Sequence, residues 1–160
     1  MSLTTRVPAI IDYLVNSFTA AATLGAAANP VTIIDGPEVF TYDGRALWVG
    51  VGDVQIGDPA PEGATSTQRW VGMGAHAINE ELSVPCIIQG WGGDQKFRPA
   101  RLDAAAILAA VEDIIRTDPS LTALALWTNV TDAVWRQGFT DKGAAVRLPF
   151  RITSTARIGA

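Results

Sequence analysis

The side chains that most often carry out chemistry are sparse in this chain and fall into no catalytic pattern. His76 is the only histidine, and no serine, cysteine or carboxylate stands at a spacing that would complete a catalytic triad or a metal site with it. We therefore expect a surface or loop role for His76. The only cysteine, Cys86, has apolar neighbours, which predicts a buried, unreactive thiol and suits a reducing compartment.

The carboxylates form no recognisable motif either. Glu80 and Glu81 are adjacent, so on a strand they would point to opposite faces. Asp53 and Asp58 lie in a glycine- and proline-rich stretch without the ligand spacing of a calcium loop. The glycines of residues 50–52 are followed neither by a further glycine at the required place nor by a helix, as a nucleotide loop requires. We expect no catalytic residue, metal or cofactor, and we do not expect an enzyme.

Composition and charge favour a folded subunit of an assembly. Hydrophobic residues make up 48% of the chain and charged residues 18%, which is typical of a globular protein that buries part of its surface in an oligomer. The net charge is −4, with 12 basic and 16 acidic residues and no basic run, so specific nucleic-acid binding is disfavoured. No signal peptide or membrane-spanning stretch is evident. We expect a soluble protein made in the cytoplasm.

Aromatic and arginine side chains are the best candidates for contacts with partners. Most of the five tryptophans should be core residues, but Trp70 and Trp91 flank expected turns, where an exposed aromatic ring often anchors a protein–protein contact. Arg147 and Arg151 lie on the polar face of the final expected strand. They could pair with acidic groups of a neighbouring subunit.

The first half of the chain predicts one helix, two strands and a long loop. Apolar residues recur at helical spacing over residues 7–24. Short β-rich runs follow at residues 31–34 and 46–51. Residues 52–67 show no periodicity and are rich in glycine and proline, so we expect a long mobile loop there within a single domain spanning residues 1–160.

The second half predicts a strand, a helix and a hairpin. Residues 82–90 alternate between apolar and outward positions, and Pro85 falls on the outward set, which predicts an edge or bulged strand. Residues 101–117 carry an apolar helical face. Residues 124–137 and 146–153 are predicted to form the two strands of a hairpin. The predicted fold is α+β, an antiparallel or mixed β-sheet with two main helices packed on one face.

The order and spacing of these features match a known family over nearly the whole chain. The marks are the helix at 7–24, Asp35-Gly36-Pro37, Leu47-Trp48-Val49-Gly50-Val51, Val84-Pro85-Cys86-Ile87-Ile88, Trp91-Gly92-Gly93-Asp94, the helix end Arg116-Thr117-Asp118-Pro119, and the final Ala156-Arg157-Ile158. With these marks the chain resembles tail terminator proteins of long-tailed, siphovirus-type bacteriophages, including those of actinobacteriophages.

The resemblance implies a virion structural protein that closes into a ring, typically a hexamer. Such a ring caps the head-proximal end of the tail tube, stops tube growth and joins the tail to the head–neck region. The implied partners are further copies of the chain, the tail tube protein and a head-closure or neck protein, while genomic DNA passes the lumen without specific binding. Ring contacts are expected at edge strands, and our hypothesis for the interface residues is Asp53, Asp58, Arg69, Trp70, His76, Trp91, Arg147 and Arg151.

Two alternatives stay open. Another neck component, such as a head-closure, adaptor or tail-completion protein, would share the small size and the ring assembly. A small-ligand-binding or enzymatic α+β domain would instead use the glycine-rich turns near Trp91.

Overall fold

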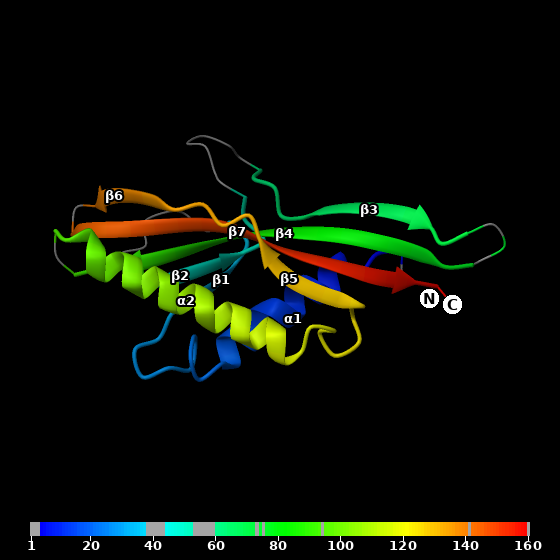
Figure 1. Cartoon of the computed structure of the whole chain (residues 1–160), viewed down its shortest axis with the longest axis horizontal. Coiled ribbons are helices and arrows are strands. Elements are labelled where there is room, and N and C mark those ends of the chain that lie inside the picture. Colours follow the sequence, from blue (N-terminus) through cyan, green and yellow to red (C-terminus); the bar gives the residue numbers. More distant parts are fainter. Residues whose placement is uncertain are drawn as a thin grey trace.

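The computed structural model describes residues 4–37, 44–52, 60–72, 74, 76–93, 95–140 and 142–159. Within these ranges the chain forms two helices on one face of a single seven-stranded sheet, as Figure 1 shows. This arrangement confirms the predicted α+β class. The elements are α1 (Val7–Ala20), β1 (Thr32–Asp35), β2 (Ala46–Val49), β3 (Thr65–Trp70), β4 (Ile78–Trp91), α2 (Phe97–Thr117), β5 (Trp127–Thr131), β6 (Arg136–Thr140) and β7 (Gly143–Ile158).

Two long antiparallel strands, β4 and β7, form the centre of the sheet. They pair from Ile78 opposite Ile158 to Trp91 opposite Ala145. β2 and β3 pair with successive halves of β4, β5 and β6 pair with opposite halves of β7, and β1 adds to β2 in parallel, so the sheet is mixed. β3 pairs with the beginning of β4 and β6 with the beginning of β7, so they lie at opposite ends of the β4–β7 pair, the right and left ends in Figure 1.

The core lies between the sheet and the helices, where the sequence periodicity predicts it. α1 buries Ile10, Leu14 and Phe18, which recur at four-residue spacing. The inward-facing residues of β4 and β7 meet them, and these are Leu82, Val84, Cys86, Ile88, Val146, Leu148, Phe150 and Ile152. A smaller apolar cluster on the other, helix-free face of the sheet contains Ile34, Ala46, Trp48, Val51 and Ile87.

Helix α2 begins at Phe97, earlier than the predicted start at residue 101. Pro99 is compatible with this earlier start, because proline is tolerated within a first helical turn, where its missing N–H has no partner to lose. The helix ends at Thr117, as predicted from the Asp-Pro step that follows. Gly90 lets α2 approach the sheet, since a Cβ atom there would lie 2.5 Å from the backbone oxygen of Ala100.

The prediction that Pro85 marks an edge or bulged strand is wrong, because β4 lies in the interior of the sheet. The carbonyl of Pro85 points to the side of β4 that β2 and β3 share, where it accepts bonds from the N–H groups of Gly50 and Val51. The proline nitrogen faces the same side, and there β2 ends opposite Cys86 while β3 begins opposite Ser83. A residue without an N–H is tolerated in this gap.

Two further boundaries differ from the sequence prediction. The single strand expected over residues 124–137 is two strands, β5 and β6, and the break between them begins at Asp132, whose φ of 56° lies in the left-handed region that aspartate tolerates. β3 begins at Thr65, so the end of the loop expected over residues 52–67 belongs to the sheet. Residues 53–59 of that loop lie outside the described residues.

Candidate assembly surface

Strand β3 is an edge strand with every side chain exposed. Among the described strands it pairs only with β4. Its two threonines and Trp70 favour the extended conformation, and it carries one charge, Arg69, and neither lysine nor proline. Lysine, proline and bulges are the usual devices that protect an edge from pairing with another chain. β3 lacks these devices.

The backbone of β3 offers three residues to a further strand. Neighbouring residues of a strand direct their N–H and C=O groups to opposite sides. The N–H of Val71 donates to the carbonyl of Ala77 at 3.1 Å, so residues of the same parity bond to β4. The residues of the other parity direct their N–H and C=O groups to the outer edge, and these are Ser66, Gln68 and Trp70.

Strand β6 forms a second exposed edge at the opposite end of the sheet. All five of its residues are exposed, and among the described strands it pairs only with β7. The N–H of Val134 donates to the carbonyl of Pro149 at 2.9 Å, so Gln137 and Phe139 present their N–H and C=O groups to the outer edge. The side-chain oxygen of Gln137 accepts a hydrogen bond at 2.8 Å from the guanidinium of Arg101, which lies on α2.

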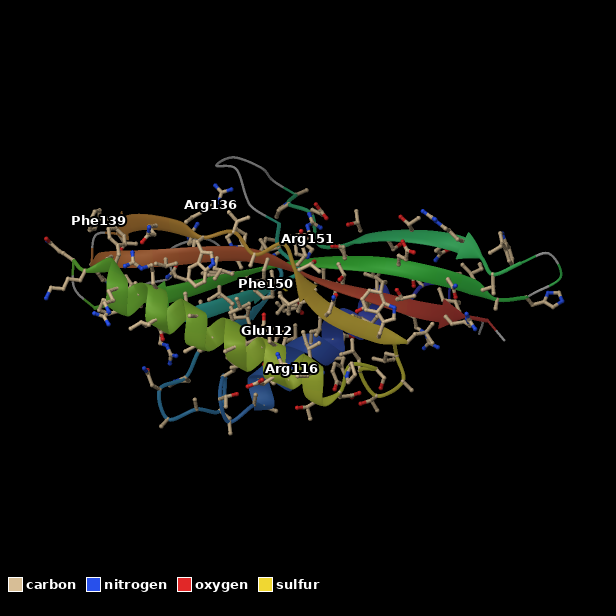
Figure 2. All side chains as sticks on the ribbon, in the orientation of Figure 1. Glu112, Arg116, Arg136, Phe139, Phe150 and Arg151 are labelled. Atoms are coloured by element: carbon tan, nitrogen blue, oxygen red, sulfur yellow. The ribbon has the colours of Figure 1, made fainter. Side chains whose placement is uncertain are left out.

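Each of these edges carries an exposed aromatic ring on the helix side of the sheet. Trp70 is 70% exposed and Phe139 is 68% exposed. Trp70 lies opposite Ile78 of β4, whereas Phe139 contacts the ring of Phe97 at the start of α2 with a centroid separation of 4.8 Å (Figure 2 labels Phe139). Exposed rings of this size are typical anchors of protein–protein contacts.

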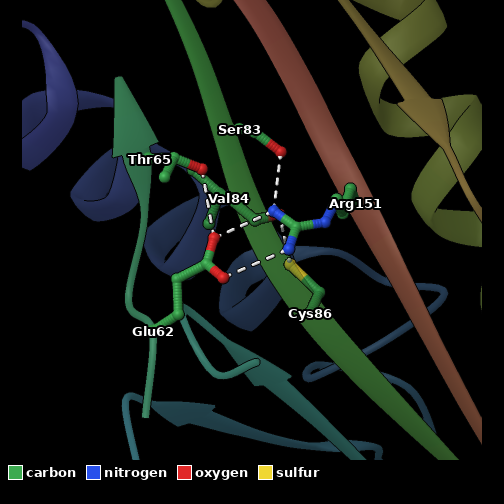
Figure 3. A network of polar contacts seen from close by, with 6 residues as sticks. All are labelled: Glu62, Thr65, Ser83, Val84, Cys86 and Arg151. Carbon is green, nitrogen blue, oxygen red and sulfur yellow. Dashed lines mark hydrogen bonds and ion pairs between the residues drawn. The ribbon is translucent and has the colours of Figure 1, made fainter. Parts of the chain in front are cut away.

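Arg151 holds the segment before β3 against the helix-free face of the sheet. Its guanidinium donates to the two carboxylate oxygens of Glu62 at 3.0 and 3.2 Å and to the hydroxyl of Ser83 at 3.1 Å, as Figure 3 shows. The hydrogen bond from Arg151 holds the pKa of Glu62 below its ordinary value, and the same bond raises the pKa of Arg151. The arginine fork matches a carboxylate in this bidentate geometry.

Arg151 thus has a carboxylate partner within its own chain, and its contact with a neighbouring subunit stays a prediction. The segment that carries Glu62 is also fixed by the N–H of Gly52, which donates to the carbonyl of Glu62 at 2.9 Å, and Ala64 packs against the main core. Residues 60–64 are thus part of the folded domain rather than of a loop that stands apart from it.

The other predicted interface residues fall into two groups. Arg69, Trp70 and the exposed His76 lie at the β3 end of the sheet. Arg147 and the half-buried Trp91 lie near the opposite end of the long strands, where the backbone N–H of Trp91 donates to Asp103 at 3.0 Å. The remaining two, Asp53 and Asp58, lie outside the described residues.

Sequence reasoning missed three features of the structure. Phe139 was not predicted as a contact residue, because a single phenylalanine before a turn is common in hairpins. Trp127 and Trp135 were expected in the core with most tryptophans, yet they are 49% and 46% exposed. Glu80 is fully buried and accepts hydrogen bonds from the Thr5 hydroxyl at 2.5 Å and the Arg6 N–H at 2.7 Å, which no spacing rule indicates.

The described residues also bear on metal binding, thiol reactivity and membrane crossing. Within the described part of the chain, no group of three or more His, Cys, Asp or Glu side chains could hold a metal ion. Burial raises the pKa of the Cys86 thiol to about 12, in agreement with an unreactive cysteine. No helix among the described residues has the length and apolar character needed to cross a membrane.

A shallow groove of about 500 Å³ crosses the helix-free face over β3, β4, β7 and β5. One row of facing residues lines it across the four strands, and this row consists of Thr67, Glu81, Thr155 and Trp127. Hydroxyl, carboxylate and indole groups in such a row are able to bind a polar ligand.

Compared with models of known protein families and with curated proteins, the chain matches none.

Proposed function

We propose that this chain is a structural subunit that joins copies of itself head to tail into a closed ring, and that the ring caps the head-proximal end of the tail tube of a long-tailed phage. The ring assembly is supported by the geometry of β3 and β6. The place in the tail is supported by the resemblance to tail terminator proteins set out from the sequence marks above.

The observation that carries the ring proposal is the position of the two fully exposed edge strands at opposite ends of one sheet. A subunit with two different edges at opposite ends of its sheet is suited to a head-to-tail contact, in which one surface of each copy meets the other surface of the next. Contacts of this kind give a ring when the rotation between copies closes.

In this proposal the tail tube protein and a head-closure or neck protein contact the two faces of the ring. DNA passes through the central channel without specific binding. The net charge of −4 agrees with this role, because a strongly basic lumen would bind phosphate groups and oppose the passage of DNA.

Tube assembly in the presence of this chain tests the proposal. Tubes polymerised from the tail tube protein of the same phage should stop growing and carry a ring at one end when the chain is added. The variant Gln137→Pro should lose this effect, because proline removes an N–H from the outer edge of β6 without removing a bond to β7. Gln137→Ala is the matched control, because both variants lose the side-chain bond to Arg101, and it should act like the wild type. Tube lengths that do not respond to the wild-type chain would contradict the proposal.

Another neck component would use the same exposed edges, and only its position separates it from a terminator. Immunogold labelling of intact virions distinguishes the two: label at the tube end beneath the neck supports the terminator, and label at the head vertex supports a head-closure or adaptor protein.

The groove over β3, β4, β7 and β5 favours a candidate of a different class, a domain that binds a small polar ligand. Thermal-shift measurements with a panel of sugars and nucleotides test it. A saturable rise in the melting temperature that is lost in Trp127→Ala would support ligand binding, since bound ligand stabilises the folded state.

A further inference from the structure

We infer that β3 of one copy pairs antiparallel with β6 of the next copy, in the register that sets Gln68 opposite Phe139 and Trp70 opposite Gln137. This inference rests on the proposed ring and specifies its interface. Its partner is a second copy of this chain.

The backbone groups of the two edges are complementary. β3 presents Ser66, Gln68 and Trp70 to its outer edge, and β6 presents Gln137 and Phe139. Residues that face each other in such positions exchange both backbone hydrogen bonds. Only two antiparallel registers use both outward residues of β6, one with Gln68 opposite Phe139 and one with Gln68 opposite Gln137.

The faces of the sheet also match in these registers. On β3 the side chains of Gln68 and Trp70 lie on the helix side, because their partners in β4 are Glu80 and Ile78. On β6 the side chain of Phe139 lies on the helix side, opposite Ala144 of β7. Residues directly opposite each other in a sheet share a face. The joined sheet therefore keeps the helices of both copies on one side, as a ring of equivalent subunits requires.

Charge selects one of the two registers. With Gln68 opposite Gln137, Arg69 of one copy would face Arg136 of the next, and like charges in directly opposite positions destabilise a strand pair. With Gln68 opposite Phe139, Arg69 faces Gly138 instead, and Thr67 faces Thr140. Threonine pairs across strands are favourable. The second register is the one that we infer.

The exposed aromatic rings meet in this register. Trp70 and Phe139 become diagonal neighbours on the helix side, at roughly 7–8 Å, which is within reach of aromatic side chains. They are the two most exposed of the large hydrophobic residues described. Trp70 would extend the pair that Phe139 already forms with Phe97. The pairing thus covers an exposed ring on each edge with the other.

Cysteine cross-linking tests the pairing and its register. Arg69 and Gly138 would face each other as a pair that exchanges no backbone hydrogen bonds, with Cα atoms about 4.5 Å apart, which suits a disulfide. A Cβ at Gly138 meets no atom within 4 Å, and the native Cys86 is buried. The double variant Arg69→Cys/Gly138→Cys, oxidised in a glutathione buffer at high protein concentration, should give a ladder of covalent multimers on a non-reducing gel.

Three controls use the same reaction. Each single variant should stay monomeric on the gel, and a mixture of the two single variants should give dimers only. Thr67→Cys/Gly138→Cys places the thiols for the rejected register on the same face and should not form the ladder. Dimers of Arg69→Cys alone would indicate pairing between two β3 strands and would overturn the inference, as would a ladder from the Thr67 variant.

The outcome for the interface is separable from the outcome for the ring. Absence of any ladder from Arg69→Cys/Gly138→Cys, while the wild-type chain still forms rings in electron micrographs, overturns the β3–β6 pairing and leaves the proposed ring. A ladder with tubes whose growth does not respond to the wild-type chain supports the pairing and contradicts the proposed role in the tail.

Discussion

Replacement of the buried Glu80 should destabilise the fold more than any other single change of a charged residue on β4. The Glu80 carboxylate is fully buried and accepts hydrogen bonds from the Thr5 hydroxyl at 2.5 Å and from the Arg6 N–H at 2.7 Å. It also accepts a longer bond from Gln68 at 3.3 Å. It thereby binds the beginning of α1 and the middle of β3, and its negative charge faces a helix N-terminus, where an anion is stabilised.

The magnitude follows from the two short bonds. A hydrogen bond to a charged group contributes about 1.5–3 kcal/mol. Because the donors are only partly buried, water would replace part of the loss, and the lower end applies to each. We therefore expect Glu80→Ala to lower the free energy of unfolding by about 3 kcal/mol, which for a chain of this length corresponds to a fall of roughly 6–12 °C in Tm.

Urea titration followed by circular dichroism measures this change, with Glu81→Ala as the matched control. Glu81 is the next residue, is exposed and lies on the helix-free face, so its removal should change the unfolding free energy by less than about 0.5 kcal/mol. Glu80→Gln keeps the shape and should fall between the two. A loss below about 1 kcal/mol in Glu80→Ala would refute the reasoning, because the carboxylate would then not hold the beginning of α1.

Three further predictions concern packing and pH. Gly90→Ala should cost about 1–3 kcal/mol in chemical unfolding, because the new Cβ meets α2 backbone at 2.5 Å, whereas Gly138→Ala meets nothing within 4 Å and should be neutral. Hydrogen bonds, above all from the Ser120 hydroxyl, lower the pKa of Asp118 from 3.8 to about 2. The stability that Asp118 provides is therefore present above pH 3.8 and is lost as the pH falls towards 2. Asp118→Asn should remove this pH dependence of stability, measured in acid titrations. Glu62→Gln should lower the free energy of unfolding by at most about 1 kcal/mol at pH 7. Because the folded-state pKa of Glu62 is lowered from 4.5, this difference in stability from the wild type should vanish as the pH falls through that lowered value. An equal difference at every pH would argue against the ion pair.

The core and the fold class were predictable from the sequence because periodicity reports burial directly. The helical spacing of Ile10, Leu14 and Phe18 and the alternation of Leu82, Val84 and Cys86 are the positions that the structure buries. Turn chemistry also located the reversal between β6 and β7. These are local properties, and local sequence carries them.

Properties that depend on neighbours in space were not predictable in this way. Pro85 was expected at an edge because proline has no N–H to donate to a neighbouring strand. In the structure, Pro85 lies in an interior strand, at the gap between β2 and β3, where no neighbouring strand needs that N–H. The partner of Arg151 is 89 residues away in sequence, and no pattern joins it to Glu62. Of the candidate surface, Arg69 and Trp70 were found from composition and expected turns, whereas Phe139 became evident only once β6 was placed at an edge.

Mass in solution, measured by light scattering across a wide range of concentrations and accompanied by negative-stain images of the same fractions, tests the central claim most directly. The proposed function predicts closed rings of one subunit number, with a central hole wide enough for duplex DNA, and their loss in Gln137→Pro but not in Gln137→Ala. A chain that stays monomeric at every concentration, and that also leaves the growth of tail tubes unchanged, would contradict the claim.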